Sequence, residues 1–203
     1  MKTLTALTLA TALAGAAAPA LAQEQGSMTL GVGIAGVLPD GSSNTAAGQI
    51  SVGDNARPTL TFEYFFADNI GVEVLAAWPF EHDIKLAGAG KVGKTKHLPP
   101  TISLQYHFTN KSSLTPFLGV GINYTTFWDD KGTGPLAGVP ISLDDSWGLA
   151  LHAGIDYALS EKSALRADVR WINIETDATV GGAPIGKVAI DPWVVGMSYV
   201  MKF

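Results

Sequence analysis

Ionisable side chains recur at every second position in several stretches of this sequence, a spacing that places them on one face of a β-strand. Arg166, Asp168 and Arg170 are the clearest case, and Glu63 and Glu73 lie in similar stretches. The alternate residues of each stretch are mostly apolar or aromatic, and residues i and i+2 of a strand share a face. Charges can be buried behind an apolar face when that face lies in lipid. The pattern therefore predicts membrane strands whose charged residues line a lumen.

We expect eight ionisable residues to point into this lumen and form a polar plug. They are Glu63, Glu73, His107, His152, Asp156, Arg166, Asp168 and Arg170. Small barrels hold such networks because the charges satisfy one another. A lipid-modifying barrel enzyme would need a Ser, His and acid set on its lipid-facing wall. Neither His107 nor His152 is expected to face outward, so we expect no enzymatic activity.

Two further motifs could indicate chemistry. The segment Gly31–Gly36 matches G-x-G-x-x-G, but it lies within a strand pattern and no helix follows, which argues against dinucleotide binding. Glu81, His82 and Asp83 could offer metal ligands together with His97, but their spacing is not diagnostic of a metal site. We expect a solvated charged loop in this region, and neither a metal nor a cofactor.

The N-terminal segment predicts export. A basic start, an apolar core from Leu4 to Ala17 and the small-x-small sequence Ala20–Ala22 predict a secretory signal peptide at 1–22, followed by a barrel domain at 23–203. The chain has no Cys, so no disulfide framework holds the exported domain. Its 13 basic residues against 18 acidic ones do not favour nucleic acid as a partner.

Eight stretches alternate between an apolar face and a small or polar face. They cover residues 29–38, 59–66, 70–80, 101–108, 115–128, 147–159, 165–172 and 191–203. The connections between them alternate long and short, with long loops at 39–57, 81–96, 129–145 and around Gly181. A soluble ligand-binding barrel would turn its apolar faces inward. We therefore predict an all-β fold, an eight-stranded antiparallel transmembrane β-barrel with short periplasmic turns and long extracellular loops.

The last stretch is the strand expected to close the barrel. From Trp193 to Phe203 every second residue is apolar, with aromatic residues at both ends. Aromatic residues ten positions apart match one tilted crossing of the hydrocarbon layer. We expect this strand to pair with the first one, residues 29–38.

Five motifs, in order along the chain, resemble the outer-membrane protein W (OmpW) family. They are Asn69-Ile-Gly-Val-Glu-Val-Leu75, His97-Leu-Pro-Pro-Thr101, Pro116-Phe-Leu-Gly-Val-Gly-Ile-Asn-Tyr-Thr-Thr-Phe127, Asp145-Ser-Trp-Gly148 and Asp191-Pro-Trp193. The resemblance implies an eight-stranded barrel in the outer membrane of a Gram-negative bacterium and a role in the passage of small hydrophobic molecules. It also implies an apolar lumen residue at Leu75, which this chain keeps, and an aromatic lumen residue in the seventh strand, where this chain has Arg170. Resemblance to outer-membrane barrels in general implies that Phe203 is recognised by the barrel-assembly machinery.

The heights of the inward residues predict an apolar cup, open to the outside, above the charged plug. Its expected ligand-binding residues are Val37, Leu75, Ala77, Phe127, Ile172, Ile174 and Val194. An eight-stranded barrel is just wide enough for side chains to fill, so an open water pore is not expected. Ligand binding and simple packing both remain open for the cup.

Three prolines indicate where a bound molecule could leave the cup. Pro79 lies near the outer end of the third expected strand, and Pro99 and Pro100 begin the fourth at the same level. Proline donates no ladder hydrogen bond. We hypothesise that a hydrophobic molecule leaves sideways into the bilayer between these strands, whereas the alternative is that the prolines only end strands and shape loops.

Two classes of function follow from the sequence. The first is a passive conduit or binding protein for small hydrophobic molecules, with outer-membrane lipid around it. The second is a structural or adhesion barrel whose extracellular loops bind partners without transport.

Overall fold

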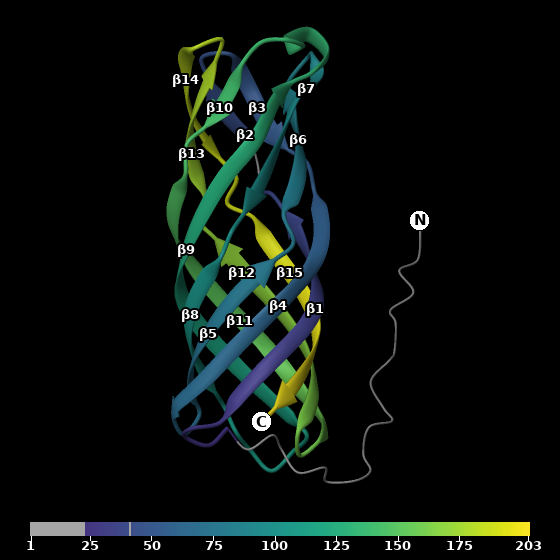
Figure 1. Ribbon diagram of the computed structural model, residues 1–203, viewed down its shortest axis with the longest axis vertical. Coiled ribbons are helices and arrows are strands. Elements are labelled where there is room, and N and C mark those ends of the chain that lie inside the picture. The colour runs from purple at the N-terminus through teal and green to yellow at the C-terminus, as the bar shows by residue number, and fades with distance from the viewer. Residues whose placement is uncertain (1–22, 41) are drawn as a thin grey trace, which may run out of the picture.

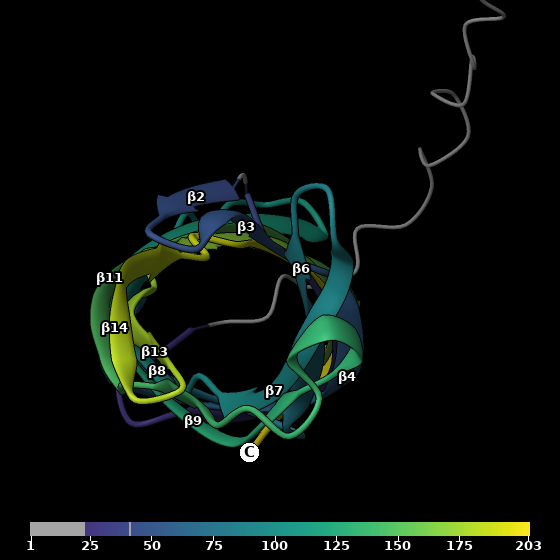
Figure 2. The same cartoon turned by 90° about the horizontal axis from the view of Figure 1, so that it is seen from above.

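Eight antiparallel strands close into a barrel in the computed structural model, which describes residues 23–40 and 42–203 (Figures 1 and 2). The predicted signal peptide lies outside the described residues. Around the barrel the strands are β1 (Met28–Leu38), β4 (Asn55–Ala67), β5 (Ile70–Ala77), β8 (Thr101–His107), β9 (Leu114–Gly132), β11 (Ser146–Ser160), β12 (Ser163–Ile172) and β15 (Trp193–Lys202). The predicted fold class is confirmed.

The first and last strands close the barrel, as the sequence predicts. β1 pairs with β15 from Thr29↔Lys202 to Leu38↔Trp193, and on its other side with β4. Phe203 continues this closure through a reciprocal backbone pair with Met28. The C-terminus therefore lies at the lower end of the barrel in Figure 1, beside the short β4–β5 and β11–β12 turns.

The segments expected as long loops are largely strands that extend the barrel wall upward (Figure 1). They form β2 (Ser42–Thr45), β3 (Gly48–Val52), β6 (Phe80–Leu86), β7 (Gly90–Leu98), β10 (Ile141–Leu143), β13 (Glu175–Val180) and β14 (Ala183–Ala189), with a short 3-10 helix at Gly134–Leu136. β6 pairs with β7, and β7 pairs with the upper part of β9. Glycines at positive φ, such as Gly88 and Gly181, make the tight turns of these hairpins. We call these seven strands the extracellular extension.

Two predicted strand ends are also corrected. The strand expected at 70–80 ends at Ala77, because Pro79 interrupts the ladder before β6 begins at Phe80. The strand expected at 115–128 continues to Gly132, since its upper part forms the wall of the extension together with β7.

Apolar side chains cover the outside of the barrel, while the inside is filled. Large apolar residues are exposed on all eight barrel strands, and Trp78 and Trp147 are each 71% exposed. The inward positions are mostly buried and include both charged and apolar side chains. This distribution is the reverse of a water-soluble barrel and suits a wall surrounded by lipid. None of the helical structure within residues 23–40 and 42–203 has the length and hydropathy of a membrane-spanning helix.

Candidate functional site

The lower lumen holds a network of ion pairs around Arg166 on β12. Its Nε lies 2.7 Å from Oδ1 of Asp156, and its Nη1 lies 2.8 Å from Oε2 of Glu73. Its Nη2 lies 3.5 Å from Oε2 of Glu63, and its guanidinium carbon lies 4.4 Å from the ring centre of Phe117. One guanidinium therefore joins carboxylates from β4, β5 and β11, with almost no contact with solvent.

The other predicted plug residues join the same network. Arg170 Nη2 lies 2.7 Å from Oε1 of Glu73, and Nε of the same guanidinium lies 3.4 Å from Oδ2 of Asp168. His152 Nε2 lies 3.1 Å from Asp168 Oδ2, and His107 Nε2 lies 2.9 Å from Glu63 Oε1. The structure thus brings all eight predicted residues together.

Glycines make room for two carboxylates of the plug. A Cβ added at Gly71 would clash with Oε1 of Glu63, and one added at Gly196 would lie 2.6 Å from Oδ1 of Asp168. The small inward residues of the strands are therefore needed by the charged side chains opposite them. This relationship was not visible in the sequence, because it depends on which positions face each other across the ladder.

Above the plug, apolar side chains pack into a layer without an open cup. Val37, Phe127, Ile172, Ile174 and Val194 of the predicted cup belong to this layer, and Ala77 packs against it. Leu75 is buried below the layer, where it lines a small void of about 20 Å³ beside Asp168 and Arg170. The expectation of an open cup at this level is wrong, because these inward side chains of the barrel strands pack together with Phe80, Ile174 and Ile190 and fill the space.

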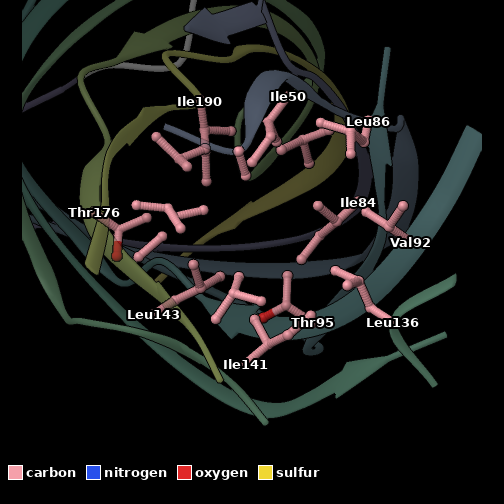
Figure 3. Close-up of a pocket in the computed structure, with 16 residues that line it drawn as sticks. Ile50, Ile84, Leu86, Val92, Thr95, Leu136, Ile141, Leu143, Thr176 and Ile190 are labelled. Carbon is pink, nitrogen blue, oxygen red and sulfur yellow. The ribbon is translucent and has the colours of Figure 1, made fainter. Parts of the chain in front are cut away.

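The open apolar cavity lies one level higher, inside the extracellular extension (Figure 3). It has a volume of about 280 Å³. We call it the upper cavity; its lining is apolar except for Thr95 and Thr176 and consists of Ala47, Ile50, Val52, Ile84, Leu86, Val92, Thr95, Leu136, Ile141, Leu143, Thr176, Ala178, Val180, Ile185, Val188 and Ile190. Figure 3 shows the labelled side chains converging from opposite walls. Ile190 also belongs to the packed layer, so the cavity rests directly on it.

The sequence pattern did not predict these cavity residues, because they fall in segments expected as loops. The sequence does contain a strand-like alternation of apolar residues in these segments, at Ile50 with Val52 and at Ile84 with Leu86. These runs are short and are soon followed by glycine, at Gly53 and Gly88, so periodicity alone does not separate them from loops.

Two histidines lie between the cavity and the barrel, where a solvated charged loop was expected. His82 on β6 and His97 on β7 are 2% and 1% exposed, and their Nε2 atoms are 2.9 Å apart. The rings of Phe80 and Phe127 flank His97, with centroids 5.5 and 5.7 Å from its ring centre. Burial lowers the pKa of His82, and burial with the adjacent His82 lowers the pKa of His97 to about 3, so both rings are neutral at pH 7.

The acidic residues beside this pair do not complete a metal site. Asp83 pairs with Lys91 at 2.6 Å, and Glu81 lies within 4.0 Å of Lys94 and Lys96 at the surface. No cluster of three or more metal-ligating side chains occurs in the part of the chain that the structure describes.

The predicted prolines lie where the wall changes from one ladder to another. The β5–β8 ladder ends at Leu75↔Thr101, and the β6–β7 ladder begins at Phe80↔His97. No strand pairing joins 76–79 to 98–100, all of which the structure describes. We call this interruption the proline seam.

Backbone groups beside the proline seam bond away from it. Trp78 N donates to Pro58 O, and the Arg57 side chain donates to Pro79 O, both toward β4. On the other side Tyr124 N donates to Pro100 O, toward β9. The two edges of the seam are thus each tied to their outer neighbours.

The apolar outer wall, the charged interior and the closed ladder define an integral barrel protein of the bacterial outer membrane. Residues 24–203 match the family model described as OmpW family, and the chain belongs to that family.

Individual relatives are similar over nearly their whole length. Outer membrane protein W of Vibrio cholerae serotype O1 is 42% identical over 210 residues, which cover 96% of this chain and 97% of the relative. The crystal structure of the outer membrane protein OprG from Pseudomonas aeruginosa superposes with a TM-score of 0.80 at 34% identity, covering 91% of this chain and 99% of OprG. A more distant relative, the dibenzothiophene metabolism operon protein PahQ of Pseudomonas aeruginosa, is 25% identical over 195 residues, covering 89% of this chain and 90% of PahQ.

Proposed function

We propose that this protein binds small hydrophobic molecules in the upper cavity and passes them passively into the outer membrane. The observation that carries the proposal is the cavity itself, about 280 Å³ and lined almost wholly by aliphatic side chains. Small-molecule sites begin at roughly 300 Å³ and are mostly apolar with a few polar groups. An apolar molecule gains about 25 cal/mol for each Å² of surface removed from water, so this lining favours a hydrocarbon over a polar solute.

The polar plug argues against passage straight down the barrel. An apolar molecule moving past Arg166 would have to separate ion pairs of 2.7 and 2.8 Å in a nearly solvent-free interior. Removing one partner from such a buried pair costs about 3–5 kcal/mol. The proposed exit is therefore lateral, through the proline seam formed by Pro79, Pro99 and Pro100, where no ladder pairing has to be broken.

One relative supports the class of ligand. PahQ is named for a dibenzothiophene metabolism operon, and dibenzothiophene is an apolar aromatic compound. The proposal involves binding and diffusion, without a chemical step or a cofactor.

Filling the upper cavity tests the proposal. Ala178 is buried in the cavity wall, and Ala178→Phe should occupy space that a ligand needs. Ala167→Phe is the matched control, because Ala167 lies on the lipid-facing side of β12. We expect Ala178→Phe to weaken naphthalene binding to the purified barrel and slow its uptake by cells, while Ala167→Phe leaves both unchanged. Normal binding and uptake in a correctly folded Ala178→Phe variant would contradict the proposal.

We also propose that Phe203 is recognised by the barrel-assembly machinery. Its side chain is 64% exposed at the end of the closing strand, and its backbone is already paired with Met28. The ring is therefore available to another protein while the backbone completes the barrel.

A further inference from the structure

The hydrogen bonds of the His82–His97 pair fix which nitrogen atoms carry protons. His82 Nδ1 lies within hydrogen-bond distance of the carbonyl oxygen of Gly53, and a carbonyl can only accept. His82 Nδ1 must therefore carry the proton, which leaves Nε2 of this neutral ring as an acceptor. Across the 2.9 Å contact, His97 Nε2 must then be the donor.

This assignment leaves His97 Nδ1 as a bare acceptor. The atom is buried and has no hydrogen-bond partner among the described residues. A buried polar atom without a partner is unfavourable, and its environment is completed when a donor reaches it. The neighbouring rings of Phe80 and Phe127 offer it no conventional donor.

His97 occupies a position between the cavity and the seam. It follows Thr95, a residue of the cavity lining, at the next inward-facing position of β7. It also precedes Pro99 by two residues, and its strand partner Phe80 directly follows Pro79. His97 itself does not line the upper cavity, so a molecule would meet its ring, among apolar and aromatic side chains, on leaving the cavity toward the proline seam.

We propose that His97 Nδ1 accepts a hydrogen bond from the ligand, so that the protein prefers small apolar molecules bearing one hydroxyl group, such as phenols and alkanols. This inference rests on the proposed function and adds a polar group to its ligand. A hydrocarbon of the same size fills the same apolar space but leaves Nδ1 unpaired. An ether with the same carbon skeleton also leaves Nδ1 unpaired, because it has no proton to donate.

Three naphthalene compounds test the preference. 2-Naphthol carries a donor, 2-methoxynaphthalene carries an acceptor only, and naphthalene carries neither. Binding would be measured by titration calorimetry on the purified full-length barrel in detergent, with empty micelles as the blank. The affinity ratio of 2-naphthol to naphthalene should be roughly three- to tenfold higher in the wild type than in His97→Phe, as expected for one hydrogen bond. 2-Methoxynaphthalene should show no such difference.

Nitrogen NMR of the wild-type protein gives a readout that does not depend on a variant folding. The ¹⁵N resonance of His97 Nδ1 should move in the direction of a hydrogen-bonded nitrogen when 2-naphthol binds, and should stay in place with naphthalene. Binding of both compounds without this difference would overturn the inference and leave the proposed function intact. Failure of all three compounds to bind would overturn both.

Discussion

Arg166 on β12 and Glu73 on β5 lie 93 positions apart in the chain, yet their Nη1 and Oε2 atoms are 2.8 Å apart inside the barrel. Arg166→Leu would leave Glu73 and Asp156 without this partner, and breaking a buried pair costs about 3–5 kcal/mol. We expect the free energy of unfolding in urea, measured in detergent micelles, to fall by about this amount. Lys111→Leu, at an exposed turn, is the control and should be nearly neutral. Equal stability of both variants would show that the plug does not stabilise the barrel.

A second prediction concerns the room that glycine provides for the plug. Gly71→Ala should force the Glu63 carboxylate away from Arg166 and His107, because the new methyl group clashes with Oε1 of Glu63. Overpacking of this kind costs about 1–3 kcal/mol. Gly36→Ala on β1 is the matched control, since an added Cβ there meets nothing within 4 Å. Urea unfolding of the two variants should separate them, and equal stability would argue against tight packing around Glu63.

The proline seam can be tested by giving its backbone new donors. Pro99→Val with Pro100→Val supplies two N–H groups that can extend the β5–β8 ladder upward. We expect slower uptake of naphthalene by cells, while binding to the purified barrel persists. Pro116→Val is the control, because Pro116 already lies within the paired part of β9. Unchanged uptake in the seam variant would exclude the lateral route.

Because His82 and His97 are buried as neutral rings, we expect the stability of the extracellular extension to depend on pH. Burial lowers the pKa of His97 to about 3 in the folded state, below the ordinary histidine value of 6.5. The stability contributed by the neutral His97 ring is therefore fully present above pH 6.5. It is lost as the pH falls from 6.5 toward 3, by up to about 1.4 kcal/mol per pH unit for one proton. Hydrogen-exchange protection factors of β6 and β7 amides, which are corrected for the intrinsic pH dependence of exchange, should fall between pH 6.5 and 5, above the range of ordinary carboxyl groups. His97→Phe should reduce this loss of protection, and an identical pH profile in the variant would contradict the assignment.

The last prediction concerns barrel closure. Deleting Phe203 removes two backbone hydrogen bonds with Met28, of 3.0 and 3.2 Å, and the exposed aromatic ring. We expect less folded protein in the outer membrane, detected by the heat-dependent electrophoretic mobility of the barrel. Phe108→Ala is the control, because Phe108 is also an exposed aromatic residue and lies just beyond the end of β8. A normal level of folded protein without Phe203 would refute its role in assembly.

The barrel itself could be predicted from the chain because its determinants are local. Alternation of period two decides which side chains face lipid, and it does so within each strand, as from Trp193 to Lys202. The plug was predictable for the same reason, since Arg166, Asp168 and Arg170 share the inward face wherever the strand lies. Pro79 and Pro99 likewise marked the seam, because proline cannot donate to a ladder in any fold.

The arrangement above the plug depends on pairing between segments that are distant in the chain. The short hairpins of the extension have weak patterns of their own, and they become strands because neighbours such as the upper part of β9 supply their hydrogen-bond partners. Because these hairpins pair, the open cavity lies at the level of Ile84 and Ala178, above the predicted cup. It also brought His82 against His97, fifteen residues apart in the chain. Such contacts depend on register and on three-dimensional closure, and neither is contained in the periodicity of a single strand.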